Sequence, residues 1–400
     1  MTVGRQIPEV PDASARRGRL AVVGLFLVNG FCYTNVVPWL PTIKSDLELS
    51  NTALGTAVAA MPLGALVTGL LAGPLIARLG SGRAAVASGF LLALTLPLVA
   101  LAPGWWSFAS ALFLLGCADA WMDAAMNAHG LRVQHRYGRT IINTFHAVWS
   151  IAAVGGGLLG ASMAGLGVPL LAHLSGVALL CVVLTLGVAR GLLPGPEHAE
   201  RGDGAPRPGG GRLVRPPVRA VFLLLGLSVL LMMAGGIEDS AASWGAVYTR
   251  HELGASAFVA GLPFVACQAM MTVGRLTGDR LTDRFGAVTV ARSGALLTAA
   301  GLGAALLVPG TGTAIAGFGL LGLGVATLFP LTLAAAGNVP GVRSGDGVAV
   351  AGWLGRLGFL GFPPLVGMIA DGTSLGVGLW VVPAGGVLAA ALAVTLRRRE

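Results

Sequence analysis

The sequence has too few charged residues for a soluble protein. Aspartate, glutamate, lysine and arginine make up 11% of its 400 residues, whereas 55% of the residues are hydrophobic. Soluble globular domains average about 25% charged residues. This shortage excludes a soluble domain and predicts a chain that faces lipid.

The sequence also lacks the short alternating segments that are typical of a membrane β-barrel. Its apolar runs are long and continuous, and a helix needs about 20 apolar residues to cross a bilayer. The 62 glycines suit helices that pack closely in a membrane. We therefore predict an all-α membrane protein.

Cysteines are few, and the four that occur lie far apart in the sequence within apolar segments, at Cys32, Cys117, Cys181 and Cys267. This distribution argues against a disulfide framework or a thiolate metal site and favours apolar packing. Paired histidines at metal spacing, a GxSxG motif and a phosphate-binding loop are also missing. We therefore expect no enzyme, no metal, no cofactor and no direct use of ATP.

The first apolar run is not followed by a small-residue cleavage site. It starts at Leu20, directly after a basic stretch, and continues past Trp39. A signal peptide is shorter and ends at such a site. The run is therefore predicted to be a retained first span.

Apolar segments of about 20 residues, with allowance for tilt, predict twelve spans. Their ranges are 20–41, 52–77, 84–103, 105–130, 141–166, 168–193, 217–247, 255–279, 287–308, 311–337, 346–370 and 374–396. They divide into an N-terminal six-helix bundle (20–193) and a C-terminal six-helix bundle (217–396). The Pro-, Gly- and charge-rich stretch 194–216 is a predicted flexible linker, and 1–19 and 397–400 are predicted tails.

Arginine is distributed unequally between the two sides of the predicted membrane. If the N-terminus is cytoplasmic, the other side holds only Lys44 and Arg250. Because loops rich in lysine and arginine face the cytoplasm, both termini and the linker are predicted to lie there, with the chain in the inner membrane. The net charge of +9 then reflects topology and not nucleic-acid binding. We expect a monomer in the lipid bilayer.

An arginine–glycine turn occurs twice, half a chain apart. One copy contains Arg78, and the other contains Arg284, 206 positions later. The pairs Leu115-Gly116 and Leu321-Gly322 share this offset. Duplicated halves are typical of a transporter in which one half rocks against the other.

The twelve predicted spans, the central linker and the two turns resemble the major facilitator superfamily over essentially the whole chain. Three stretches, at 143–150 (NTFHAVWS), 274–280 (GRLTGDR) and 356–359 (RLGF), resemble its rhizopine-associated, MosC-like bacterial subgroup. The resemblance implies two pseudo-symmetric six-helix bundles around a central cavity, alternating access and commonly proton coupling.

The resemblance also implies a charge latch at the repeated turn, and the two copies differ in it. Ala77 replaces the acidic residue of the family turn in the first copy, whereas Asp283 keeps it in the second. Arg275, Asp279 and Asp283 stand at every fourth residue where the eighth span is predicted to leave the membrane, a spacing that stabilises or latches helices. The predicted gating residues are Arg78, Arg275, Asp279, Arg280, Asp283 and Arg284.

Ionisable side chains inside apolar spans are the main candidates for transport, because a charge is costly to bury in a bilayer. Asp119, Asp123 and Asn127 occur at every fourth residue, in one stripe about 12 Å long at a rise of ~1.5 Å per residue. Proton or substrate coupling competes there with a structural polar contact. Glu238 and Asp239 in span seven are further candidate proton carriers, or they line a solvated vestibule.

Arg356 lies near the middle of the eleventh predicted span. Because arginine stays charged, it requires a carboxylate or an anionic substrate. Our hypothesis is that Arg356 pairs with Asp119 or Asp123 when the inner gate is closed. The alternative is a constant packing contact.

Neutral polar and aromatic side chains supply further predicted substrate contacts. Asn29 and Tyr33 stand four apart in span one and suit hydroxyl- or amide-bearing ligands, although polar contacts between helices fit equally well. His146 fits a proton relay or a gate hydrogen bond. The Gly235-Gly236 pair predicts a weakened helix in span seven. The predicted substrate-binding residues are Asn29, Tyr33, Asn127, His146, Trp244, Gln268 and Arg356.

These features predict a proton-coupled secondary active transporter whose partners are protons and a small polar substrate, such as a sugar, polyol or amino-polyol. The nearest alternative is a proton-driven efflux pump for hydrophobic or cationic compounds. The glycine-rich stretch 155–160 lacks the proline that the resemblance implies for such exporters. A membrane-embedded enzyme and a non-transporting sensor are more distant alternatives.

Overall fold

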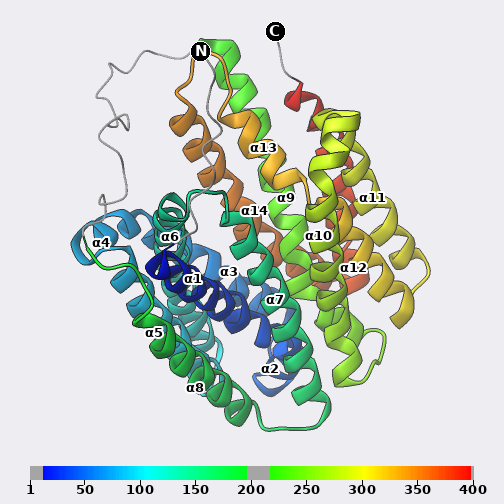
Figure 1. The fold of residues 1–400 in the computed structure, drawn as a ribbon. Coiled ribbons are helices and arrows are strands. Elements are labelled where there is room, and N and C mark those ends of the chain that lie inside the picture. Colours follow the sequence, from blue (N-terminus) through cyan, green and yellow to red (C-terminus); the bar gives the residue numbers. More distant parts are fainter. Residues whose placement is uncertain (1–11, 196–216, 398–400) are drawn as a thin grey trace.

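The structure, a computed structural model, describes residues 12–195 and 217–397 (Figure 1). Most of the predicted linker and the ends of the predicted tails (1–11, 196–216 and 398–400) lie outside the described residues. The described part is helical, and twelve of its helical segments are long and apolar enough to cross a membrane. The predicted all-α fold with twelve spans is confirmed.

The N-terminal bundle consists of the helices before the linker. They are α1 (Ala13–Cys32), η1 (Tyr33–Asn35), η2 (Val37–Trp39), α2 (Leu40–Asp46), α3 (Asn51–Thr68), η3 (Gly69–Leu71), α4 (Ala72–Leu79), α5 (Ser81–Ala100), α6 (Trp105–Tyr137), α7 (Ile142–Gly165) and α8 (Leu170–Ala189). The C-terminal bundle consists of α9 (Val218–His251), α10 (Ala257–Phe285), α11 (Ala287–Leu307), α12 (Thr311–Val325), α13 (Leu328–Ala336), α14 (Ser344–Gly372), α15 (Leu375–Gly378), α16 (Val381–Leu392) and η4 (Ala393–Leu396).

The repeated turn has the same backbone conformation in both bundles. Gly80, between α4 and α5, has φ 79° and ψ 151°, and Gly286, between α10 and α11, has φ 81° and ψ 152°. This region is open essentially to glycine alone. The duplication seen in the sequence is therefore also a duplication of backbone geometry.

A second pair of glycines shows the same repeat in helix packing. A Cβ atom on Gly116 would lie 1.9 Å from the carbonyl oxygen of Met61, and one on Gly322 would lie 2.1 Å from that of Cys267. Both contacts bring two helix backbones together, α3 with α6 and α10 with α12. Small residues permit such close approach in membrane helices.

Several helix limits differ from those predicted. The first span begins at Ala13 instead of residue 20, because Asp12 caps it by accepting a hydrogen bond from the Ala15 amide. It then continues through η1, η2 and α2 to Asp46. The second span breaks at Gly69 into α3, η3 and α4, and the tenth span breaks into α12 and α13.

Span seven is not broken at its glycine pair, where the sequence predicted a weakened helix. Gly235 and Gly236 lie inside the uninterrupted helix α9. Cβ atoms there would come within 2.4 Å of Phe359 and 2.3 Å of Phe362 on α14. The glycine pair therefore makes room for two aromatic rings.

Two of the cysteines that are far apart in the sequence meet in space. The Sγ atoms of Cys32 on α1 and Cys181 on α8 lie 3.5 Å apart. All four cysteines are buried free thiols. The contact shows how closely α1 and α8 pack.

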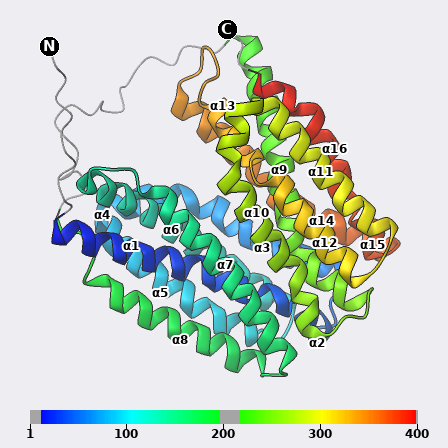
Figure 2. The same ribbon diagram turned by 45° about the vertical axis from the view of Figure 1, so that its right-hand side comes forward.

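The two bundles form a V, as Figures 1 and 2 show. We call the side where α1 begins and η4 ends the terminus side, and the other the opposite side. At the terminus side, α4 and α6 of one bundle diverge from α13 of the other. At the opposite side the bundles meet, chiefly through α3 with α14 and α7 with α10.

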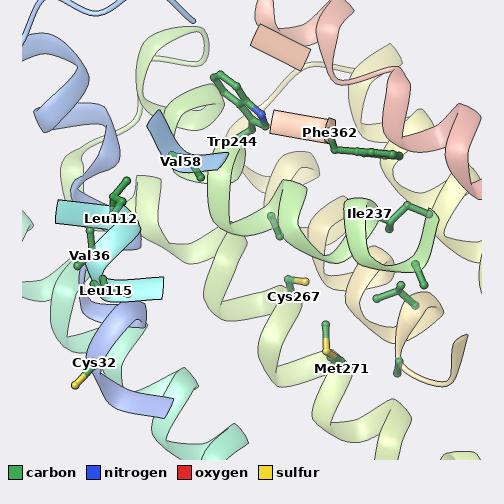
Figure 3. Close-up of a cluster of buried hydrophobic side chains, with 14 of the residues drawn as sticks. Cys32, Val36, Val58, Leu112, Leu115, Ile237, Trp244, Cys267, Met271 and Phe362 are labelled. Atoms are coloured by element: carbon green, nitrogen blue, oxygen red, sulfur yellow. The ribbon is translucent and has the colours of Figure 1, made fainter. Parts of the chain in front are cut away.

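Polar and apolar contacts close the opposite side. The Asp371 carboxylate at the end of α14 accepts hydrogen bonds from the amides of Asn51 and Thr52 at the start of α3, both at 2.8 Å. His251 Nε2 lies 3.2 Å from the carbonyl oxygen of Pro41. Figure 3 shows buried apolar side chains from both bundles, including Val58, Trp244 and Phe362.

Candidate functional site

Asp119 is held in place by the amide of Asn29. The Asn29 Nδ2 donates to Asp119 Oδ1 at 2.8 Å, and the Asn29 Oδ1 accepts from Trp149 Nε1 at 2.8 Å. One amide on α1 thereby connects α6 with α7. Asn29 is 6% exposed, so these bonds form in a largely buried setting. In this structure Asn29 therefore acts as a polar contact between helices.

Trp149 is the site residue that the sequence predictions missed. It stands in the stretch 143–150, and its counterpart Trp353 lies 204 positions later. Both observations pointed to the residue, but neither pointed to Asn29 as its partner. That partner follows only from the rotation of α1 and α7 about their axes.

Asp123 and Asn127 form a second polar cluster, together with groups from other helices. The Asn127 Nδ2 donates to Asp123 Oδ1 at 3.0 Å, within one turn of α6. His146 on α7 and Arg356 on α14 both lie close enough to Asp123 to interact with it electrostatically. The cluster therefore includes a residue from each bundle.

Arg356 extends from α14 towards the N-terminal bundle. Its Nη1 lies 3.4 Å from the place that a Cβ atom on Gly69 would occupy, at the break after α3. Among the described carboxylates, none comes within 4 Å to form an ion pair with it. Its hypothesised pairing with Asp119 or Asp123 in the closed state stays a prediction.

This cluster faces the interface between the bundles and is nevertheless exposed. Asp123, His146 and Arg356 interact across the interface, yet the side chain of each is exposed. Their spans continue on both sides of them. The space between the bundles is therefore open to solvent from the terminus side as far as this level.

Arg275 forms an ion pair with an acid of another helix. Its Nη2 lies 3.6 Å from Glu238 Oε1 on α9, so it pairs with an acid of another span and not with Asp279 on its own helix. Arg275 is 37% exposed and Glu238 21% exposed. This ion pair joins α9 and α10 inside the C-terminal bundle.

The other predicted gating residues stay outside these clusters. All are exposed side chains at the terminus side, and none makes an ion pair within 4 Å in the described part of the chain; they are Arg78, Asp279, Arg280, Asp283 and Arg284. The Arg284 guanidinium lies 5.3 Å from the ring centre of Phe285. The bundles are apart at this level, so a latch would not be engaged here.

Asp239 accepts a hydrogen bond within its own helix and lies near a residue of the other bundle. The Ser243 Oγ donates to Asp239 Oδ2 at 2.8 Å, and Tyr33 on η1 lies close enough to Asp239 to interact electrostatically. Tyr33 also packs with Val37 and Phe264 in a small apolar cluster shared by both bundles. Asp239 therefore faces the N-terminal bundle.

The remaining predicted ligands, Trp244 and Gln268, have no polar side-chain partner among the described residues. Trp244 is 0% exposed, and its Nε1 has no hydrogen-bond partner there. It is packed at the closed opposite side and offers no open surface to a ligand in this conformation. Gln268 is half-buried on α10.

The charges in these spans do not balance. Glu238 pairs with Arg275, and Arg356 is near Asp123, but in the described chain Asp119 and Asp239 have only neutral hydrogen-bond partners. An unpaired buried charge is costly. The two acids suit a proton or a cationic group, and within the described residues no three metal-ligating side chains gather into a cluster.

Both acids are next to the same helical segment. Asn29 bonds to Asp119, and Tyr33, four residues further along, interacts with Asp239. Residues four apart lie on one face of a helix. An acid of each bundle therefore lies near the first span, and one of them, Asp119, is hydrogen-bonded to it.

Comparison with known sequences places this architecture among transporters. Residues 22–280 match the model of the Major Facilitator Superfamily. The chain is 30% identical over 356 residues to an MFS-type transporter of Yersinia pestis, covering 88% of each chain. It is also 30% identical over 380 residues to the membrane protein MosC of Rhizobium meliloti, covering 95% of this chain and 90% of MosC.

Solved structures share the fold at low sequence identity. The nucleoside transporter NupG has a TM-score of 0.71 at 16% identity, and the match covers 97% of this chain and 100% of NupG. A bacterial homologue of the human lysosomal transporter Spinster has a TM-score of 0.69 at 14% identity and covers 96% and 95%. FucP has a TM-score of 0.62 at 17% identity and covers 96% and 100%.

Proposed function

This chain belongs to the Major Facilitator Superfamily, and from that premise we propose that it is a proton-coupled secondary transporter of a small polar metabolite. The resemblance to this family and to MosC predicted from the sequence is confirmed. The family and the fold are those of transporters and not of enzymes. The substrate class, the coupling to protons and the orientation in the inner membrane are the parts that we propose beyond the family.

The observation that carries the proposal is the position of Asp119 and Asp239 beside the first span. Asp119 and its partner Asn29 belong to one bundle, so their bond can persist when the bundles rock. Asp239 and Tyr33 belong to different bundles, so rocking must change their distance. A carboxyl group whose surroundings change with the conformation can take up a proton in one state and release it in another.

The arrangement of the bundles supports one of the two access states that such a mechanism requires. Contacts such as Asp371 with Asn51 close the opposite side, while the side chains around Asp123 are exposed in the space that opens towards the terminus side. With cytoplasmic termini, as the arginine distribution predicts, this state is open to the inside. The other state requires the contacts at the opposite side to break.

The chemistry of the two acids supports one substrate class over the others. Asp119 and Asp239 have no cationic partner among the described residues, and Asp239 lies near Tyr33, whose hydroxyl can donate or accept a hydrogen bond. An amino-polyol offers an ammonium group for one acid and hydroxyl groups for hydrogen bonds. Within the proposed class it fits better than a neutral sugar or polyol.

Transport into proteoliposomes tests the proposal. Uptake of glucosamine, myo-inositol and the hydrophobic cation tetraphenylphosphonium would be followed with and without an imposed proton gradient. We expect gradient-driven movement of the amino-bearing polar compound, and loss of this coupling in Asp119→Asn and Asp239→Asn. Asp46→Asn, an exposed acid at the end of α2, is the matched control.

Two results would contradict the proposal. If both Asp119→Asn and Asp239→Asn keep the gradient dependence of the wild type, these acids do not take part in coupling. Transport of tetraphenylphosphonium but of neither polar compound would show that the protein is the efflux pump and not the metabolite transporter.

A further inference from the structure

Many arginines and few acids lie among the described residues at the terminus side of the N-terminal bundle. Its exposed or half-buried arginines are Arg16, Arg17, Arg19, Arg78, Arg83, Arg136, Arg139 and Arg190. Among the described residues at this face, Asp12 is the only acid. Among the described residues of this face, arginines therefore clearly outnumber acids.

Asp12 is already engaged with one of these arginines. Its Oδ2 accepts hydrogen bonds from Arg136 Nη2 at 3.0 Å and Nε at 3.1 Å. Hydrogen bonds from the Ala15 amide and from Arg136 hold the pKa of Asp12 below its usual value of 3.8. Asp12 therefore stays ionised at neutral pH and compensates Arg136.

Two further guanidinium groups converge on one tyrosine. The Arg19 Nη1 donates to the Tyr137 hydroxyl at 3.1 Å, and Arg19 Cζ lies 5.5 Å from the centre of the Tyr137 ring. Arg139 Cζ, from the turn after α6, lies 5.1 Å from the same ring centre. Two guanidinium groups are therefore held next to one aromatic ring, and an anion that contacts them would reduce the repulsion between their charges.

An exposed apolar side chain adjoins this cluster. Arg16, Arg19 and Leu20 stand three and four residues apart on α1, so they share one face of the helix. Arg16 is exposed, and Leu20 is 69% exposed. Along this face of α1, guanidinium groups are therefore followed by an exposed leucine.

We propose that Arg16, Arg19 and Arg139 bind the phosphate of an anionic phospholipid, with Leu20 against its acyl chain. Guanidinium groups bind phosphate through paired hydrogen bonds. Juxtamembrane arginines are attracted to anionic lipids. A choline headgroup would add a fourth cation to the three arginines, whereas a glycerol headgroup adds no charge. The exposed side chain of Leu20 favours a lipid over free phosphate.

Native mass spectrometry of the full-length protein tests this site. Delipidated protein in detergent would be titrated with dioleoyl phosphatidylglycerol or with dioleoyl phosphatidylcholine, which share their acyl chains. The wild type should retain phosphatidylglycerol preferentially. The double variant Arg19→Gln/Arg139→Gln should bind it roughly 10- to 30-fold more weakly, because each juxtamembrane arginine contributes to lipid attraction.

The control is Arg83→Gln, an exposed arginine near the start of α5 on the same side, which should bind as the wild type does. Equal retention of both lipids by the wild type, or an equal loss in Arg83→Gln, would overturn the proposal. Displacement by millimolar inorganic phosphate would overturn it in favour of a free-anion site. If the double variant does not fold, Arg139→Gln alone decides, since Arg139 is exposed in a turn and its loss should still weaken binding severalfold.

Discussion

At the scale of single residues, Asn29 holds the most connected position in the candidate site. Its amide satisfies both the carboxylate of Asp119 and the indole of Trp149. A carboxylate and an indole N–H that lose their partner inside a protein cost free energy, because neither regains a full set of hydrogen bonds. Asn29 is thus a positioning residue for Asp119.

Replacement of Asn29 by leucine should lower stability and disturb coupling together. Leucine is of similar size but leaves Asp119 and Trp149 without their partner, at a cost of about 1–3 kcal/mol. Thermal unfolding in detergent and gradient-driven uptake would measure both effects. Asn127→Leu is the comparison, because Asn127 bonds only within its own helix turn at an exposed site. Equal stability of the two variants would contradict the assigned role.

At the scale of helices, Asp371 connects the end of α14 to the start of α3. Its two carboxylate oxygens accept from two successive amides that α3 cannot satisfy internally. The negative charge also lies at the positive end of the helix dipole. Because α3 and α14 belong to different bundles, this cap stabilises the closed opposite side.

The variant Asp371→Asn should shift the population towards opening at the opposite side. Loss of a helix cap costs about 0.5–2 kcal/mol, which corresponds to roughly a 2- to 30-fold change in population. Labelling of a cysteine introduced at Val58, inside the closed region, would measure the opening. Asp46→Asn should leave the labelling rate unchanged. A rate in Asp371→Asn equal to the wild type would show that the cap does not hold this side closed.

At the scale of the whole molecule, alternating access requires the two arms of the V to close at the terminus side. Arg356 already extends towards Gly69 and interacts with Asp123 across the interface, at a distance beyond that of an ion pair. Closure would bring these groups nearer. Their attraction would then belong to the closed state more than to the open one.

The variants Asp123→Asn and Arg356→Gln should each disfavour closure, and the double variant should show less than the sum of the two effects. Spin labels at Leu79 and Phe285, exposed residues of the two repeated turns, would report the distance between the arms. We expect the shorter distance to be less populated in each single variant. Strictly additive effects would mean that the two residues act separately. Arg190→Gln, which neutralises an exposed arginine elsewhere on this side, is the control.

Much of the fold could be predicted, because the cost of placing a residue in lipid depends mainly on the polarity of that residue and not on its partners. Twelve spans follow from the length of apolar runs, and the repeat follows from landmarks such as Gly80 and Gly286, whose shared backbone angles leave little choice but glycine. The acids Asp119 and Asp239 stood out for the same reason. A charge inside an apolar run is conspicuous in the sequence itself.

Partners and contacts could not be predicted in this way. The sequence suggested Asp279 as a neighbour of Arg275, but the structure pairs Arg275 with Glu238. It suggested a weakened helix at Gly235, where the structure has a site for the ring of Phe359. In each case the deciding contact came from another helix, and the spacing of residues along one helix carries no information about it.

The amino-acid sequence by itself determined the class, the spans, the repeat and the positions of the charges, because hydropathy and backbone freedom are properties of local segments. The tertiary structure alone decided which charges meet, that Asn29 joins Asp119 to Trp149, and that one side is closed while the other is open. Those contacts depend on the rotation and spacing of packed helices, and all the side chains of the bundle together set these distances.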